Sequence, residues 1–206
     1  MIRVLAVDDH PVFRAGLAAL MANERDMRIV GEASNGREAV ERVRELQPDI
    51  TLLDYQMPEM NGIDAMRIIR SEHPAVRIIC LTTYAGDVLA QRILRAGAQA
   101  YLLKGMIRGE LLDTIRAVHR GQKRVSADVA TQLAHHMGDD VVSEREMEVL
   151  KLIARGNSNK RIAGHLFISE ETAKGHVKSI LAKLGANDRT HAVTLGLMRG
   201  IIELQP

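Results

Sequence analysis

Three carboxylates, one hydroxyl and one ammonium group end short apolar runs in the first half of the chain. These runs are rich in Val, Ile and Leu and are typical of β-strands. The residues that end them are Asp8, Asp9, Asp54, Thr82 and Lys104. Because open α/β sheets bind ligands outside the carboxyl ends of their strands, we expect these five side chains to meet at one edge.

Three converging carboxylates repel one another unless a cation lies among them. Mg²⁺ suits such a set, since it prefers oxygen ligands and keeps several of its waters. One carboxylate can then attack phosphorus and form an acyl phosphate, while Mg²⁺ and Lys104 neutralise the phosphoryl oxygens. Thr82 would supply a hydroxyl group to the same phosphoryl group. The sequence therefore predicts a phosphoryl-transfer site.

Each of these residues also has a purely structural interpretation. Asp8 and Asp9 are suitable caps for the next helix, and Asp54 is a common first residue of a turn. Thr82 can cap a helix, and Lys104 can be a solvated surface lysine. The coincidence of polar groups at four strand ends favours the functional interpretation.

Strands and helices that would position these groups alternate five times over residues 1–120. Strands are predicted at 2–7, 27–32, 50–54, 77–82 and 100–103. A helix follows each strand, and the first helix opens with Pro11 and runs to about residue 23. This order predicts an α/β fold with a five-stranded, doubly wound parallel sheet.

The strand pattern stops near Ser126, which indicates a second and smaller domain. A short helix at 128–137 and the turn that begins at Gly138 are expected to form part of a linker, residues 121–142. Residues 143–206 are expected to form an all-α domain with helices at 143–155, 158–166, 169–184 and 188–199.

The composition fits a two-domain cytoplasmic protein. The chain has 206 residues, of which 46% are hydrophobic, enough for one full core and a smaller one. The single cysteine, Cys80, lies inside an apolar run and gives no disulfide framework. No run has the length of a signal peptide core or of a membrane span, so we expect no membrane partner.

Positive charge is concentrated in the second domain, although the net charge of the whole chain is only +2. Between Val149 and Arg189 eight basic residues face three acidic ones, an excess of five positive charges. Such a segment is expected to bind a polyanion.

The predicted helix at 169–184 has two distinct faces. Its apolar face holds Ala173, Val177, Ile180, Leu181 and Leu184, and its other face holds Glu171, Lys174, Gly175, Lys178 and Ala182. It follows a shorter helix across a tight connection, which is helix-turn-helix spacing. The alternative is an ordinary amphipathic helix with a solvated basic face.

The first 120 residues resemble the receiver domain of bacterial two-component response regulators. The resemblance rests on the segments Val7-Asp8-Asp9-His10-Pro11, Leu53-Asp54-Tyr55-Gln56-Met57-Pro58, Leu81-Thr82-Thr83 and Tyr101-Leu102-Leu103-Lys104. It implies a flavodoxin-like fold, with Asp54 accepting a phosphoryl group from a histidine kinase or from small acyl phosphates.

The same resemblance implies a role for each residue around Asp54. Asp9 and Asp54 would bind Mg²⁺ directly, Asp8 would bind it through water, and the backbone carbonyl of Gln56 would complete the protein ligands. Thr82 and Tyr101 would form the switch pair that responds to the phosphoryl group. The sequence departs from many receivers at Gly105, which follows Lys104 where a proline is common.

Residues 142–204 resemble the LuxR-type DNA-binding domain, and the two domains together resemble the NarL/FixJ class. The segments that carry this are Ser143-Glu144-Arg145-Glu146-Met147-Glu148-Val149-Leu150, Gly156-Asn157-Ser158-Asn159-Lys160, Ile168-Ser169 and Lys183-Leu184 through Arg189-Thr190. The implied DNA-contacting residues are Lys174, Gly175, Lys178, Ser158, Lys160, Thr172, Lys183 and Arg189. A homodimer on an inverted repeat of double-stranded DNA is implied as well. Gly175 and Ala173 replace the bulkier residues usual in the family, which predicts weak or unusual base readout.

The resulting hypothesis is a DNA-binding response regulator, not a metabolic enzyme, switched by phosphorylation of Asp54. One rival is a phosphatase of the haloacid-dehalogenase kind, but Asp8-Asp9-His10 does not provide the DxD motif of that class. The other rival is a DNA-binding protein whose first domain acts only as a protein-docking or dimer module, without phosphorylation.

Overall fold

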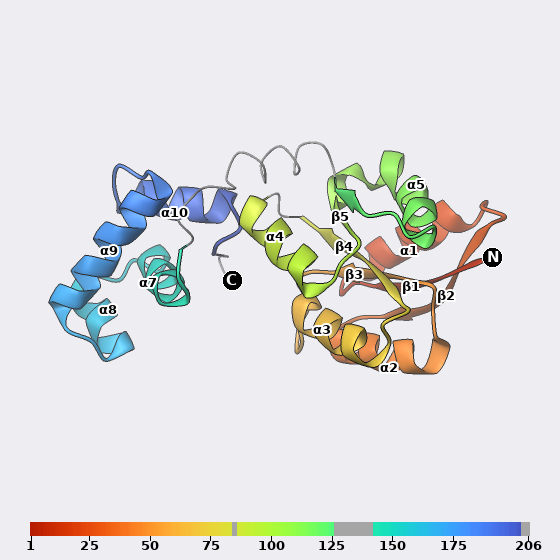
Figure 1. The fold of residues 1–206 in the computed structure, drawn as a ribbon, viewed down its shortest axis with the longest axis horizontal. Helices are drawn as coiled ribbons and strands as arrows, with labels where there is room; N and C mark the ends of the chain where they lie inside the picture. The colour runs from red at the N-terminus through yellow and green to blue at the C-terminus, as the bar shows by residue number, and fades with distance from the viewer. Residues whose placement is uncertain (84–85, 126–141, 203–206) are drawn as a thin grey trace. The chain divides into compact units, whose positions relative to one another are not determined.

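The structure is a computed structural model that describes residues 1–83, 86–125 and 142–202 (Figure 1). The described residues form two compact units, one of 1–83 with 90–125 and one of 86–89 with 142–202. Each unit is considered by itself. None of the described helices is both long enough and apolar enough to cross a membrane.

The first unit is built on a six-stranded parallel sheet with the order β2-β1-β3-β4-β5-β6. The strands are β1 Ile2–Val7, β2 Met27–Ala33, β3 Ile50–Asp54, β4 Arg77–Thr82, β5 Ala100–Leu103 and β6 Arg124–Val125. The parallel α/β class is confirmed, but the strand number of five is one too low. The extra strand has two residues at the sheet edge, too few to show any period in the sequence.

Five α-helices connect the strands of this unit. They are α1 Pro11–Met21, α2 Gly36–Leu46, α3 Gly62–Glu72, α4 Asp87–Ala96 and α5 Ile107–His119, and a 3-10 turn, η1 Lys104–Met106, precedes α5. Residues 90–96 of α4 belong to this unit, whereas its first three residues belong to the second. Asn35 and Asn61 cap α2 and α3, because their side chains accept the amide hydrogens of Glu38 and Asp64. The first helix ends two residues earlier than the sequence pattern suggested.

Helices cover both faces of the sheet, with α1 and α5 on one side and α2 and α3 on the other (Figure 1). On the first side the strand residues Val4, Leu52 and Leu81 pack against Leu17 of α1 and Leu111 of α5. The intervening strand residues, such as Leu5, Leu53 and Cys80, are buried as well. A parallel sheet buried on both faces needs apolar residues at nearly every position, so the polar groups collect at the strand ends.

The second unit contains four helices around a small core. They are α7 Glu144–Ala154, α8 Asn159–Leu166, α9 Glu170–Leu184 and α10 Arg189–Met198. The core includes Val149 and Leu150 of α7, Ile162 of α8, Ile180 of α9 and Ala192 of α10. The all-α character is confirmed. The short helix expected at 128–137 lies outside the described residues.

Candidate functional site

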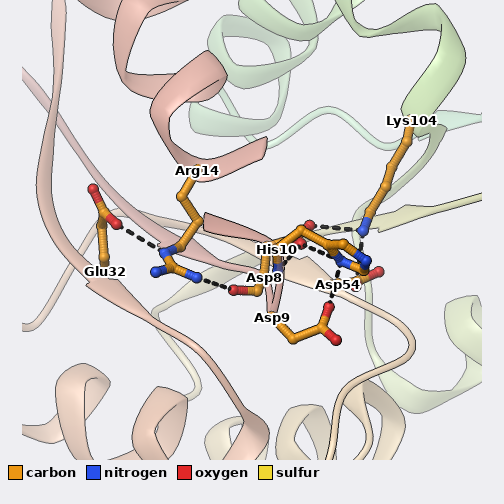
Figure 2. A network of polar contacts seen from close by, with 7 residues as sticks. All are labelled: Asp8, Asp9, His10, Arg14, Glu32, Asp54 and Lys104. Atoms are coloured by element: carbon orange, nitrogen blue, oxygen red, sulfur yellow. Dashed lines mark hydrogen bonds and ion pairs between the residues drawn. The ribbon is translucent and has the colours of Figure 1, made fainter. Parts of the chain in front are cut away.

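The register of the sheet brings the polar strand ends to one edge. Asp54 at the end of β3 lies opposite Leu81, so Thr82 is one residue further along β4. Thr82 in turn lies opposite Leu103, which Lys104 follows directly. Asp8 and Asp9 follow β1, the other neighbour of β3. Figure 2 shows Asp8, Asp9, Asp54 and Lys104 gathered at this edge.

Lys104 joins two of the carboxylates. Its Nζ lies 2.8 Å from Asp54 Oδ2 and 2.7 Å from Asp8 Oδ2. The ammonium also lies 4.8 Å from the centre of the Phe13 ring, within cation–π range. Asp8 is fully buried and Asp54 is 3% exposed. Because buried carboxylates need compensation, this one cation holds the two acids together.

The pKa values show how incompletely the charge is balanced. Burial raises the pKa of Asp54 to about 6, and the hydrogen bond and charge of Lys104 offset only part of that effect. Burial opposes the ammonium form of Lys104, yet its hydrogen bonds to Asp54 and Asp8 outweigh burial and raise its pKa. The site therefore lacks positive charge and favours a further cation.

The donor set at this edge fits a divalent metal ion. One ligand atom each from Asp8, Asp9, His10 and Asp54 lie within 4.8 Å of one another. The buried oxygens Asp8 Oδ2 and Asp9 Oδ1 each have one ion-pair contact: Lys104 Nζ lies 2.7 Å from Asp8 Oδ2, and His10 Nδ1 lies 2.7 Å from Asp9 Oδ1. Carboxylate oxygens have further lone pairs, and a hard cation such as Mg²⁺ binds oxygens of this kind.

The structure excludes the alternative that Asp8 and Asp9 cap α1. The N-cap position is His10, and its side chain makes no capping hydrogen bond. Asp8 Oδ1 instead accepts the amide hydrogen of His10, at 2.9 Å, which shapes the loop after β1. The acidic pair is thus left for the site.

Two residues around Asp8 were not anticipated from the sequence. Arg14 of α1 donates to the backbone oxygen of Asp8 at 2.6 Å and to Glu32 of β2 at 2.8 Å (Figure 2). His10 lies beside both Asp8 and Asp9. The available signals were the place of His10 directly after the acidic pair and the place of Arg14 one turn into the following helix.

The remaining predicted residues lie at or behind the same edge. Thr82 is 1% exposed and Tyr101 is fully buried, opposite Cys80 in the sheet. Gln56 is partly exposed in the loop that follows β3. The positions suit residues that surround Asp54, with Tyr101 three residues further from the edge than Lys104.

An apolar groove borders the acidic site. It has a volume of about 850 Å³, and its lining includes Val12, Phe13 and Leu20 of α1 together with Lys104 and Ile107. Val12 is 86% exposed and adds its apolar side chain to this surface. The groove therefore offers an apolar surface within reach of Lys104.

In the helical unit, α9 has the two faces that its sequence predicted. Ala173, Ile180 and Leu184 are buried, whereas Lys174, Gly175 and Lys178 are exposed. Ser169 caps the helix by accepting the amide hydrogen of Thr172 at 3.0 Å. Phe167, in the left-handed conformation with φ 54°, turns the chain between α8 and α9.

The other predicted DNA-contacting residues are exposed or partly exposed, and two of them, Arg189 and Lys183, contact other residues of their own domain. Ser158, Lys160 and Thr172 are exposed. Arg189 is also exposed but donates to the backbone oxygen of Asn157 at 2.6 Å. Lys183 forms an ion pair with Glu146 at 2.9 Å and is 23% exposed. Lys183 is therefore partly committed to its own domain.

Glu146 ties the start of α7 to α9. Its carboxylate accepts the amide hydrogen of Ser143 at 2.7 Å and the hydroxyl of Ser179 at 2.6 Å, in addition to the Lys183 contact. The site is buried, but the three donors outweigh burial and lower the pKa of Glu146 to about 2. Only the capping-box spacing of Ser143 and Glu146 was visible in the sequence.

Comparison with known families identifies both units. The family described as "Response regulator receiver domain" matches residues 4–116. The family described as "Bacterial regulatory proteins, luxR family" matches residues 140–195.

Individual relatives agree over nearly the whole chain. "Response regulator protein VraR" of Staphylococcus aureus is 35% identical over 98% of this chain and 99% of its own length. The crystal structure of the response regulator ChrA of a heme-sensing two-component system is 34% identical, covers 98% of both chains and has a TM-score of 0.57. A LuxR-family two-component response regulator from Aurantimonas sp. SI85-9A1 is 34% identical over 66% of this chain and 98% of its own, with a TM-score of 0.64. The chain therefore belongs to the response regulators that join a receiver domain to a LuxR-family regulatory domain.

Proposed function

We propose that the chain is a DNA-binding response regulator whose Asp54 accepts a phosphoryl group from a sensor histidine kinase. Phosphorylation would favour a homodimer and thereby change transcription at promoters that carry an inverted repeat. The observation that best supports this proposal is the position of Lys104. Its Nζ lies 2.8 Å from Asp54 and 2.7 Å from Asp8, at an edge of the sheet that also holds Asp9.

In the proposed reaction an Asp54 carboxylate oxygen attacks the phosphorus of the donor. The bond between phosphorus and the donor's nitrogen, or its acyl oxygen, breaks, and the donor keeps the electron pair. Lys104 neutralises the phosphoryl oxygens, and the Thr82 hydroxyl donates a hydrogen bond to one of them. Mg²⁺, held by Asp9, Asp54 and the Gln56 carbonyl, with Asp8 bound through water, would supply the remaining positive charge.

The apolar groove beside Lys104 supports a protein donor. A phosphohistidine must approach Asp54 closely, so the part of the kinase that carries it needs a surface next to the site. The groove between Val12 and Ile107 has this position and an apolar lining. We therefore assign it to the phosphorylated domain of the kinase.

The exposed face of α9 supports DNA binding by the second unit. Lys174 and Lys178 would lie towards the major groove beside Gly175, and Ser158, Lys160, Thr172, Lys183 and Arg189 would contact phosphates. A solved structure of an RcsB–DNA complex shares this fold at 24% identity over 96% of this chain, with a TM-score of 0.72. A regulator that binds bacterial chromosomal DNA would act in the cytoplasm.

We propose the following domain organisation: residues 1–120 form the receiver, residues 121–142 form a linker with a short helix, and residues 143–206 form the DNA-binding domain. The acyl phosphate is then a signal between the two domains. Thr82 and Tyr101 would respond to it as the switch pair.

The first experiment tests the acceptor. The full chain is incubated with acetyl phosphate and Mg²⁺, and intact mass spectrometry is expected to show the addition of one phosphoryl group. Asp54→Asn should abolish the gain, because the amide cannot act as the nucleophile, and the matched change Asp113→Asn on the exposed side of α5 should not. An unchanged mass in the native chain, or a gain that persists in Asp54→Asn, contradicts the proposal.

The second experiment tests the output. Random double-stranded DNA is selected on the phosphorylated chain, and the selected sequence is expected to contain an inverted repeat. Mobility-shift titrations of that DNA should show tighter binding with acetyl phosphate and Mg²⁺ than without them. Equal affinities would contradict the claim that phosphorylation controls DNA binding, but not the claim that the chain binds DNA.

A further inference from the structure

Four arginines surround one hollow on the receiver, away from the acidic edge. The hollow has a volume of about 340 Å³ and is lined by Arg67 and Arg70 of α3, and by Arg92, Arg95 and Ala96 of α4. Each helix contributes two arginines three residues apart, which places both members of a pair on the same face. The two pairs therefore converge from neighbouring helices.

Little negative charge balances these guanidinium groups. Arg92 and Arg95 form no hydrogen bond or ion pair with any residue that the structure describes. Arg67 has one exposed pair with Asp64, at 3.3 Å, and such pairs contribute little. Four like charges around one hollow repel one another, and an anion between them would relieve that repulsion.

Arg70 is fixed in the wall of the hollow. Its NH1 atom donates to the backbone oxygens of Pro74 at 2.7 Å and Val76 at 3.2 Å. A Cβ at Gly97 would lie 3.0 Å from Arg70 Cγ, and Gly97 has a φ of 113°, so a glycine is needed there for two reasons. Part of the site is thus organised before any ligand binds.

Helix dipoles explain only half of the cluster. Arg70 and Arg95 lie in the last turns of α3 and α4, where a positive charge is favoured. Arg67 and Arg92 lie about one turn earlier, where that effect has faded. Their presence in the same hollow calls for a different reason.

We propose that this hollow binds the phosphate chain of an oligophosphate, either a nucleoside triphosphate or inorganic polyphosphate. Guanidinium groups form paired, charge-assisted hydrogen bonds with phosphate oxygens, and four of them match a ligand with three or more negative charges. The volume lies in the range of small-ligand sites. This site is independent of the phosphoryl group proposed for Asp54.

The test is isothermal titration calorimetry of the full chain with sodium tripolyphosphate, without Mg²⁺ because the ion would chelate the probe. Saturable binding of one tripolyphosphate per chain is expected. The double variant R92Q/R95Q should weaken it by about tenfold or more, since each change removes charged hydrogen bonds. Both side chains are exposed, so the fold should persist, and unchanged phosphorylation by acetyl phosphate verifies that it does.

Two matched variants separate this site from general charge effects. R37Q/R42Q removes the same charge from exposed positions of α2, and R25Q/R28Q removes it from exposed positions near the start of β2; both should bind as the native chain does. Tighter binding of ATP or GTP than of tripolyphosphate would identify a nucleotide as the source, and equal affinities would identify inorganic polyphosphate. Absence of saturable binding, or equal weakening in R37Q/R42Q or in R25Q/R28Q, overturns the proposal.

Discussion

At the residue scale, the charge balance of the acidic site depends on one ammonium group, that of Lys104. Lys104 bridges Asp8 and Asp54, two carboxylates that are almost completely buried. The pKa of Asp54 is still raised to about 6 despite this contact, so one lysine does not offset the burial of the acidic set. The free protein therefore carries an electrostatic cost that a metal ion can remove.

Replacing Lys104 exposes this cost directly. In Lys104→Gln the two carboxylates lose their cation, and we expect the receiver to lose about 3 kcal/mol of unfolding free energy. Mg²⁺ should recover more stability in this variant than in the native chain, because the ion no longer competes with an ammonium group. Differential scanning calorimetry with and without Mg²⁺ measures both effects.

The control for this prediction is Lys123→Gln, since Lys123 is an exposed lysine of the same unit. It should leave both the unfolding temperature and the response to Mg²⁺ unchanged. A Lys104→Gln variant as stable as the native chain would show that Asp8 and Asp54 do not depend on Lys104 for compensation.

At the element scale, the capping box of α7 also anchors α9. Glu146 satisfies the backbone at Ser143 and holds Ser179 and Lys183 of α9 through the same carboxylate. A local capping motif thus fixes the helix that presents Lys174 and Lys178. The angle of α9 therefore depends on two long-range contacts of Glu146. Ser179 lies 33 positions after Glu146 in the sequence, and Lys183 lies 37 positions after it.

This contact gives the helical unit a defined response to acid. The pKa of Glu146 is lowered from 4.5 to about 2, so the ionised carboxylate stabilises the folded state. The stabilisation, about 3 kcal/mol, is complete above pH 4.5 and is lost as the pH falls through 2. Protection factors of peptides from α7 and α9, which compare the observed exchange with the intrinsic rate at each pH, should fall over this interval.

Glu146→Gln should remove most of that pH dependence, because a neutral amide does not titrate there. Glu148→Gln provides the matched change on the same helix, at an exposed position that pairs with Arg145. If both variants exchange like the native chain as the pH falls, Glu146 is not the responsible group.

Gly175 allows the packing and recognition roles of α9 to be separated. A Cβ at this position would meet nothing within 4 Å, and the residue is exposed in the middle of the helix. Gly175→Ala should therefore stabilise the helical unit by about 1 kcal/mol. Gly164→Ala, in an equally open position of α8, should stabilise it similarly.

DNA affinity then tests whether the glycine serves recognition. We expect Gly175→Ala to weaken binding of the selected DNA in mobility-shift titrations, since the added methyl group lies between Lys174 and Lys178. Gly164→Ala should bind DNA as the native chain does. Unchanged DNA affinity in Gly175→Ala would place Gly175 outside the interface.

At the scale of the whole molecule, the proposed signal passes from one acyl phosphate to a pair of DNA-binding units. Two linked units gain affinity because binding of the first makes binding of the second intramolecular. Sedimentation of the phosphorylated chain is expected to show dimers, whereas Asp54→Asn treated in the same way should remain monomeric. Identical sedimentation of the two samples would contradict dimerisation as the output.

Salt dependence measures how many positive charges each chain places on DNA. Removing a phosphate contact at Lys160 or Arg189 should reduce the slope of log affinity against log salt by about one. Lys123→Gln, an exposed lysine of the receiver, should not change the slope. Because Lys183 is held by Glu146, we expect its removal to have a smaller effect than removal of Lys160.

The sequence by itself determined the class of fold and the place of the acidic site. Alternating strand and helix patterns fix a parallel sheet, and such a sheet brings Asp8, Asp54, Thr82 and Lys104 to one edge whatever the details of packing. The amphipathic pattern of 169–184 was equally readable, because a helix has one period along its whole length.

Only the tertiary structure decided which groups touch. The two-residue strand β6, the contacts of Arg14 with Asp8 and Glu32, and the hold of Glu146 on Lys183 all join residues distant in sequence. The hollow between α3 and α4 likewise depends on tertiary contacts. Neither pair of arginines is unusual within its own helix, and only the packing of the two helices brings the pairs together. Periodicity reports the environment along one element, whereas contacts between elements depend on how their faces pack together.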